Sequence, residues 1–80
     1  MAEKAEISVI GCIKKGVEAG CIILVTSGGK EYSLHGKSLP TLGKGLGVSA
    51  KGTTGGVDTC MQGTPLDVIS WNWTREKCPE

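Results

Sequence analysis

Short stretches in which apolar and polar residues alternate occupy most of this chain, and this period of two is typical of half-buried β-strands. Residues 7–14 are rich in β-branched side chains, and in residues 46–51 the apolar Leu46, Val48 and Ala50 alternate with glycine, serine and lysine. No stretch keeps the 3.6-residue period of an amphipathic helix. The pattern therefore predicts five strands, which cover residues 7–14, 20–26, 31–35, 46–51 and 66–73.

A pair of glycines between the second and third predicted strands favours a tight hairpin. Gly28–Gly29 can adopt the positive φ angles of a two-residue primed turn. With this loop, Val25 would face Tyr32 and Ile23 would face Leu34, so that four large apolar side chains share one face. The polar residues of the opposite face would be Thr26, Glu31, Ser33 and His35.

Five short strands with a long third connection favour one small all-β domain. The connection, residues 36–45, contains Pro40, and residues 38–42 could form a single helical turn. Closing a barrel from short strands needs sharp bends, which glycines within strands supply. Suitable glycines are Gly11, Gly20, Gly47 and Gly52. We therefore expect a five-stranded Greek-key barrel like the OB fold, which binds oligonucleotides and oligosaccharides in other proteins.

Length and composition limit what the domain can be. Eighty residues form one domain at a size where a single core gives only marginal stability, and without Phe this core must consist mainly of Ile, Leu and Val. The net charge of +1 predicts no strong electrostatic attraction to nucleic acid or membranes, and no apolar run could span a bilayer. We expect a flexible N-terminal segment in residues 1–6, the barrel in residues 7–74 and a tail in residues 75–80 that is tethered by Cys78.

Five short motifs form an ordered series along the chain. They are Val9-Ile10-Gly11-Cys12-Ile13, Lys15-Gly16, Gly29-Lys30-Glu31-Tyr32-Ser33-Leu34, Val48-x-Ala50-x-Gly52 and Leu66-Asp67-Val68. In this order they resemble small OB-like domains of secreted or periplasmic bacterial proteins. The resemblance spans about residues 7–74 and implies the barrel fold, but many of these domains have no assigned function.

Four cysteines in a short chain predict two disulfides and an oxidising compartment. Their separations of 9, 39 and 18 positions do not match the closely spaced cysteine pairs of zinc sites. The predicted first hairpin would place Cys12 opposite Cys21, which leaves Cys60 to pair with Cys78. The resemblance instead implies a Cys12–Cys78 pair, because the related domains have a Gly-Cys in the first strand and a cysteine near the C-terminus. Cys21 would then pair with Cys60, and both chain ends would be tied down.

The N-terminus and the cysteines point to different compartments. Residues 1–6 are polar and lack the apolar segment of a secretory signal. We nevertheless expect a secreted or periplasmic protein whose leader is absent from this sequence, because four cysteines without redox or metal spacing are otherwise unexplained. Free thiols would instead indicate a cytoplasmic protein.

No arrangement of side chains predicts catalysis, a metal site or a cofactor. His35 is the only histidine, and it falls on the face predicted to be exposed. No two carboxylates have a spacing recognisable for acid–base catalysis. The glycine-rich stretches 36–38 and 43–47 lack the spacing of phosphate-binding and dinucleotide-binding loops. We therefore expect no enzyme activity, no metal and no cofactor.

The aromatic residues are the best candidates for binding. Trp71 and Trp73 lie two residues apart on the last predicted strand, so we expect them to share a face with Ile69 and to point away from Val68. They would either cover a core without Phe, or form a stacking platform for a sugar or an unpaired base. An exposed pair would also suit contact with a partner protein or a second copy of the chain. The candidate binding residues are Tyr32, Trp71, Trp73 and Lys30.

These observations favour a non-enzymatic extracytoplasmic binding module. A partner protein or a component of the cell envelope is the favoured ligand, followed by carbohydrate. Single-stranded nucleic acid is less favoured, because the net charge is near zero and no basic stripe lies beside the tryptophans. The alternative hypothesis is a structural module without a ligand.

Overall fold

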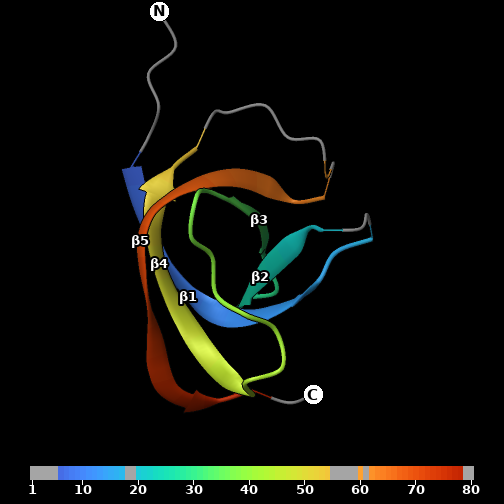
Figure 1. The fold of residues 1–80 in the computed structure, drawn as a ribbon, viewed down its shortest axis with the longest axis vertical. Coiled ribbons are helices and arrows are strands. Elements are labelled where there is room, and N and C mark those ends of the chain that lie inside the picture. Colours follow the sequence, from blue (N-terminus) through green and yellow to red (C-terminus); the bar gives the residue numbers. More distant parts are fainter. Residues whose placement is uncertain (1–5, 18–19, 55–59, 61, 79–80) are drawn as a thin grey trace, which may run out of the picture.

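The computed structural model describes residues 6–17, 20–54, 60 and 62–78, which form an all-β domain (Figure 1). The strands are β1 (Glu6–Lys15), β2 (Ile22–Thr26), β3 (Glu31–His35), β4 (Leu46–Thr53) and β5 (Thr64–Lys77). The prediction of five strands is confirmed, and the last strand is longer than predicted and includes Pro65. No helix in the described part of the chain is long and apolar enough to cross a membrane.

The five strands form one sheet with the order β1-β2-β3-β5-β4, and the sheet closes into a ring because β4 also pairs with β1. Neighbouring strands are antiparallel except for β3 and β5, which run parallel. The ring is uneven. Along β5, the pairing with β3 is limited to Thr64–Asp67 at its start, whereas the pairing with β4 extends from Asp67 to Lys77.

β1 contributes to both sides of the ring because it bends at Gly11. Residues 6–11 pair with β4, and residues 11–15 pair with β2. A Cβ atom at Gly11 would overlap the carbonyl group of Val25 and the side chain of Leu24. The close approach of β1 to β2 therefore requires a residue without a side chain. Beyond the bend, β1 leaves β4.

The core lies inside the ring and is mainly aliphatic. Its buried members are Val9, Leu24, Tyr32, Leu34, Val48, Ala50 and Leu66. Trp71 and Trp73 are partly buried and pack against this cluster, so they cover part of a core that lacks Phe. Full burial of one aliphatic side chain such as Leu66 contributes roughly 1.5–3 kcal/mol to stability.

The hairpin between β2 and β3 has a three-residue loop, Ser27–Gly29, in place of the predicted two-residue loop. The N–H of Gly29 donates to the carbonyl of Thr26, and the N–H of Thr26 donates to the carbonyl of Lys30, both at 2.9 Å. Gly29 has a φ of +86°. This is the geometry of a type I turn followed by a bulged residue in the left-handed conformation, where glycine is favoured.

One extra loop residue changes the register of the hairpin. The observed pairs are Ile22–Leu34, Ile23–Ser33, Leu24–Tyr32 and Val25–Glu31. The predicted pairing of Val25 with Tyr32 and of Ile23 with Leu34 is therefore wrong. Ser33, which was predicted to be exposed, is 0% exposed, as is Ile23 beside it on the outer side of the ring.

Described residues that precede β2 and β5 lie over this outer side of β2 and β3. A disulfide joins Cys21 to Cys60, and both residues are buried. The N–H of Val17 donates to Oε1 of Gln62 at 3.0 Å, and Nε2 of Gln62 donates to Oε1 of Glu31 at 3.3 Å. This cover accounts for the burial of an apolar and a hydroxyl side chain on the outside of the ring.

Ile69 forms a β-bulge in β5. The pairing of β5 with β4 shifts between Lys51 and Gly52, so that Ile69 is an extra residue on β5. A bulge reverses the alternation of side chains along a strand. Val68 and the two tryptophans therefore all pack against the core, while Ile69 is 62% exposed. The prediction that the tryptophans share a face with Ile69 and point away from Val68 is wrong.

Two disulfides join Cys12 to Cys78 and Cys21 to Cys60. The pairing implied by the resemblance is confirmed, and the alternative pairing is wrong. The alternative pairing fails because of the register between β1 and β2. Cys12 lies opposite Val25, so Cys21 is four positions away along the hairpin. Two intramolecular disulfides fit an oxidising, extracytoplasmic environment.

Candidate functional site: the Trp73 pocket

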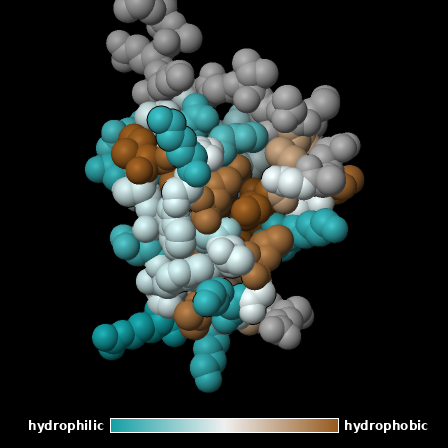
Figure 2. All heavy atoms as spheres, viewed as in Figure 1, coloured by the Kyte–Doolittle hydropathy of each residue, from teal (hydrophilic) through white to brown (hydrophobic). Residues whose placement is uncertain are grey.

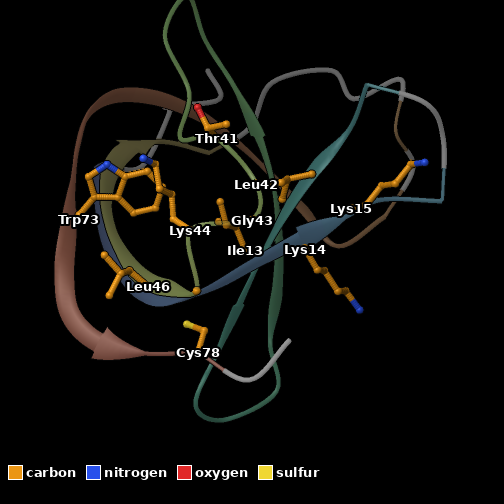
Figure 3. Close-up of a pocket in the computed structure, with 11 residues that line it drawn as sticks. Ile13, Lys14, Lys15, Thr41, Leu42, Gly43, Lys44, Leu46, Trp73 and Cys78 are labelled. Atoms are coloured by element: carbon orange, nitrogen blue, oxygen red, sulfur yellow. The ribbon is translucent and has the colours of Figure 1, made fainter.

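A pocket of about 350 Å³ opens where β1 and β4 diverge (Figure 3). We call it the Trp73 pocket. Its apolar lining consists of Ile13, Leu42, Leu46 and Trp73, and its lysines are Lys14, Lys15 and Lys44. The site therefore combines an apolar interior with a positively charged rim.

Three strands and one connection form the walls of the pocket. The pairing of β1 with β4 ends at Gly11 and Val48, so Ile13 of β1 and Leu46 of β4 face an opening and not each other across a ladder. Trp73 of β5 closes one side. The fourth wall is the end of the connection between β3 and β4, which crosses the face of the ring seen in Figure 1.

A disulfide and a backbone hydrogen bond hold two of these walls together. The N–H of Cys78 donates to the carbonyl of Gly45 at 2.8 Å, and Cys78 is bonded to Cys12 of β1. Cys78, which directly follows β5, thus ties the connection between β3 and β4 to β1. This arrangement limits how far the pocket can open or collapse.

Lys14 is engaged by an ion pair. Its Nζ lies 2.8 Å from Oε2 of Glu31. The hydrogen bond from Lys14, followed by that from Gln62, lowers the pKa of the Glu31 carboxyl below its ordinary value. Glu31 therefore stays ionised and paired at neutral pH, and it offsets the charge of Lys14.

Lys15 and Lys44 supply positive charge that no acidic residue in the described part of the structure offsets. Both residues are exposed, and no salt bridge joins either of them to a residue that the structure describes. None of the eleven described residues that line the pocket is acidic. The rim is therefore positively charged although the whole chain carries a net charge of only +1.

Three of the four predicted binding residues do not line this pocket, and two of them, Tyr32 and Lys30, lie together at the hairpin. Tyr32 is 7% exposed and belongs to the core. The ammonium group of Lys30 lies 5.3 Å from the centre of the Tyr32 ring, within reach of a cation–π interaction. This contact closes the end of the hairpin and leaves little aromatic surface for a ligand.

The two tryptophans lie in contact but face different surroundings. Their ring centres are 5.2 Å apart and their planes are at 88°, an edge-to-face geometry. The indole N–H of Trp71 donates to the carbonyl of Ser38 at 3.1 Å, and Trp71 borders a separate hollow that Lys37 and Ile69 also line. Perpendicular rings do not form one flat stacking platform. Trp73 is the predicted binding residue that lines the pocket.

The surface around the site is mixed. Figure 2 shows apolar side chains near the middle of the face and hydrophilic side chains around its edges. Leu42 of the pocket is 38% exposed. A ligand in the pocket would therefore cover apolar surface that now meets water.

Sequence reasoning did not identify Ile13, Leu42, Leu46 or Lys44 as site residues. The glycines on either side of Lys44 indicated a loop, but they carried no signal of where that loop packs. The opening depends on where β1 parts from β4, which is a contact between distant parts of the chain.

Nothing in the described residues resembles a metal centre. They contain no group of three or more His, Cys, Asp or Glu residues that could hold a metal ion, and no free cysteine. Comparison with known proteins adds no assignment: no family model, no curated protein and no solved structure matches this chain.

Proposed function

We propose that this protein is a non-enzymatic binding module, built on an OB-like Greek-key barrel, that works in an extracytoplasmic compartment. Three features support the fold: the strand order β1-β2-β3-β5-β4, the parallel pairing of β3 with β5, and a first strand shared by both sides of the ring. The two disulfides support the compartment.

The observation that carries the binding function is the half-buried Trp73 in an apolar pocket with a lysine rim. Ligand sites are typically concave, mostly apolar and equipped with a few polar groups that orient the ligand. The proposed ligand is a small group with an apolar surface. It is either free or presented by a component of the cell envelope or a partner protein, and a sugar ring is the next candidate.

The location of the pocket also bears on the kind of ligand. OB barrels bind oligonucleotides and oligosaccharides on the face of β2 and β3, between the connections that precede β2 and β5. In this chain Ile23 and Ser33 of that face are buried, and the Cys21–Cys60 disulfide joins the two connections across it. This favours a small ligand in the Trp73 pocket over a strand of nucleic acid along β2 and β3.

Chemical-shift mapping tests this proposal. The oxidised, ¹⁵N-labelled protein would be titrated with benzyl alcohol, benzoate, benzylamine and methyl glucoside. We expect at least one probe to shift the signals of Ile13, Leu42 and Leu46 and the indole signal of Trp73. The Trp73→Leu variant should lose this response, because it removes the ring that lines the pocket.

The matched control is Ile69→Leu, which changes an exposed residue of β5 outside the pocket. It should leave the titration unchanged. If no probe shifts the pocket signals of the folded protein, the binding function is wrong and the structural-module hypothesis takes its place.

A further inference from the structure

The size and lining of the Trp73 pocket indicate a compact, flat ligand. Its volume of about 350 Å³ lies near the lower end of the roughly 300–1,000 Å³ range of ligand pockets. Ile13 and Leu46 offer aliphatic walls, and Trp73 offers the part of its ring that Trp71 does not contact. Aromatic rings pack best in offset-stacked or edge-to-face contacts. A flat apolar ring fits these walls better than an extended chain.

The charge of the rim indicates an anionic group on the same ligand. Figure 3 draws Lys44 on the Trp73 side of the pocket, whereas Lys15 lies on the opposite side with its ammonium group pointing away from the pocket. Lys44, from the connection before β4, is therefore the lysine placed to meet a ligand that lies against Trp73. Because Lys44 has no acidic partner among the described residues, an anion bound there would not compete with an existing ion pair.

Two other hollows in the described part of the structure lack this combination. The hollow on the outer side of β1, of about 640 Å³, is lined by Glu76 as well as by Lys14 and Lys77. The hollow beside Trp71 has Lys37 as its charged residue and contains the bulged Ile69. The Trp73 pocket differs in having a lysine on the same side as a tryptophan and no acidic residue among the described residues of its lining.

We propose that the ligand of the Trp73 pocket is a small anion in which a flat apolar ring carries a carboxylate or phosphate group. The ring lies against Trp73, and the anionic group lies beside Lys44. This inference rests on the proposed binding function and specifies its ligand class.

A charge series on one ring tests the inference. The probes are 2-naphthoate, 2-naphthalenemethanol and 2-naphthylmethylamine, which share the ring and differ in charge. Their dissociation constants would be measured by chemical-shift titration at low salt. We expect naphthoate to bind up to about fivefold more tightly than the alcohol, since one exposed ion pair contributes at most about 1 kcal/mol. The amine should bind most weakly, and added salt should weaken only naphthoate binding markedly.

Substitutions of single lysines identify the ammonium group that attracts the anionic probe. Lys44→Gln should weaken naphthoate binding several-fold and change the affinity for naphthalenemethanol much less. Lys15→Gln should change naphthoate binding less than Lys44→Gln does, because the Lys15 ammonium group points away from the pocket. Lys37→Gln is the matched control, because Lys37 is an exposed lysine of a neighbouring hollow. It should change neither affinity. A phosphate counterpart, 2-naphthyl phosphate, distinguishes a carboxylate site from a phosphate site by which of the two anions binds more tightly.

Two results would overturn the inference in different ways. Equal affinity for the anion, the alcohol and the amine in the Trp73 pocket would refute the anionic ligand and leave the binding function standing. If none of the probes shifted the pocket signals, the binding function itself would fail, and the inference with it.

Discussion

Trp71 and Trp73 differ in what their indole rings contact, although they lie two residues apart on β5. The N–H of Trp71 is bonded to the carbonyl of Ser38, so Trp71 attaches the connection between β3 and β4 to the sheet. Trp73 has no such bond to a described residue and lines the pocket. Side-chain chemistry is identical in the two residues, and position alone gives one a structural contact and the other a free surface.

At this scale we predict that Trp71→Phe destabilises the protein more than Trp73→Phe. Both changes remove similar apolar area, but only the first removes a hydrogen bond. The bond contributes at most about 1 kcal/mol, because the Ser38 carbonyl is exposed and can accept from water instead. Urea denaturation of the oxidised variants would measure the difference in the free energy of unfolding. Equal losses would show that the bond to Ser38 contributes nothing measurable.

At the scale of elements, irregular positions determine which side chains face the core. The three-residue loop sets the register of β2 and β3, and the bulge at Ile69 brings both tryptophans to the inner side of β5. The sequence could not decide either feature. Residues 22–25 are apolar on both faces, so alternation does not select a register, and Ser27–Lys30 suits both a two-residue and a three-residue loop.

The bend of β1 yields a prediction at the same scale. Gly11→Ala should destabilise the protein by about 1–3 kcal/mol, because its Cβ would overlap the backbone of β2 and force the strands apart. Gly28→Ala is the control, since the nearest atom to its Cβ, Oγ1 of Thr26, is 4.0 Å away. Thermal and urea unfolding would compare the two variants. A stable Gly11→Ala protein would mean that β1 can bend without close contact.

At the scale of the whole molecule, the disulfides join parts of the chain that the ring brings together. Cys12–Cys78 spans 66 positions and fixes the end of β5 to β1 beside the pocket, while Cys21–Cys60 spans 39 positions and covers β2 and β3. Cross-links over such distances restrict the unfolded chain strongly. A domain of this size with a small aliphatic core depends on that restriction.

We predict that replacing either cysteine pair with serine lowers the free energy of unfolding by about 2–5 kcal/mol. Cys12→Ser with Cys78→Ser should also weaken naphthoate binding, because that disulfide joins two walls of the pocket. Cys21→Ser with Cys60→Ser should leave binding intact while the protein remains folded. Urea denaturation and chemical-shift titration would measure both effects. An unchanged unfolding free energy in both variants would contradict this role of the disulfides.

The amino-acid sequence by itself determined the all-β class, the five strands and the presence of disulfides. These properties depend on local alternation, on turn residues and on cysteine number, which can be read without knowing which distant residues meet. Only the tertiary structure decided the order of the strands, the burial of Ser33 and the pocket beside Trp73. These depend on where the ladder of β1 and β4 ends and where a bulge shifts β5, and such long-range contacts leave no periodic trace in the chain.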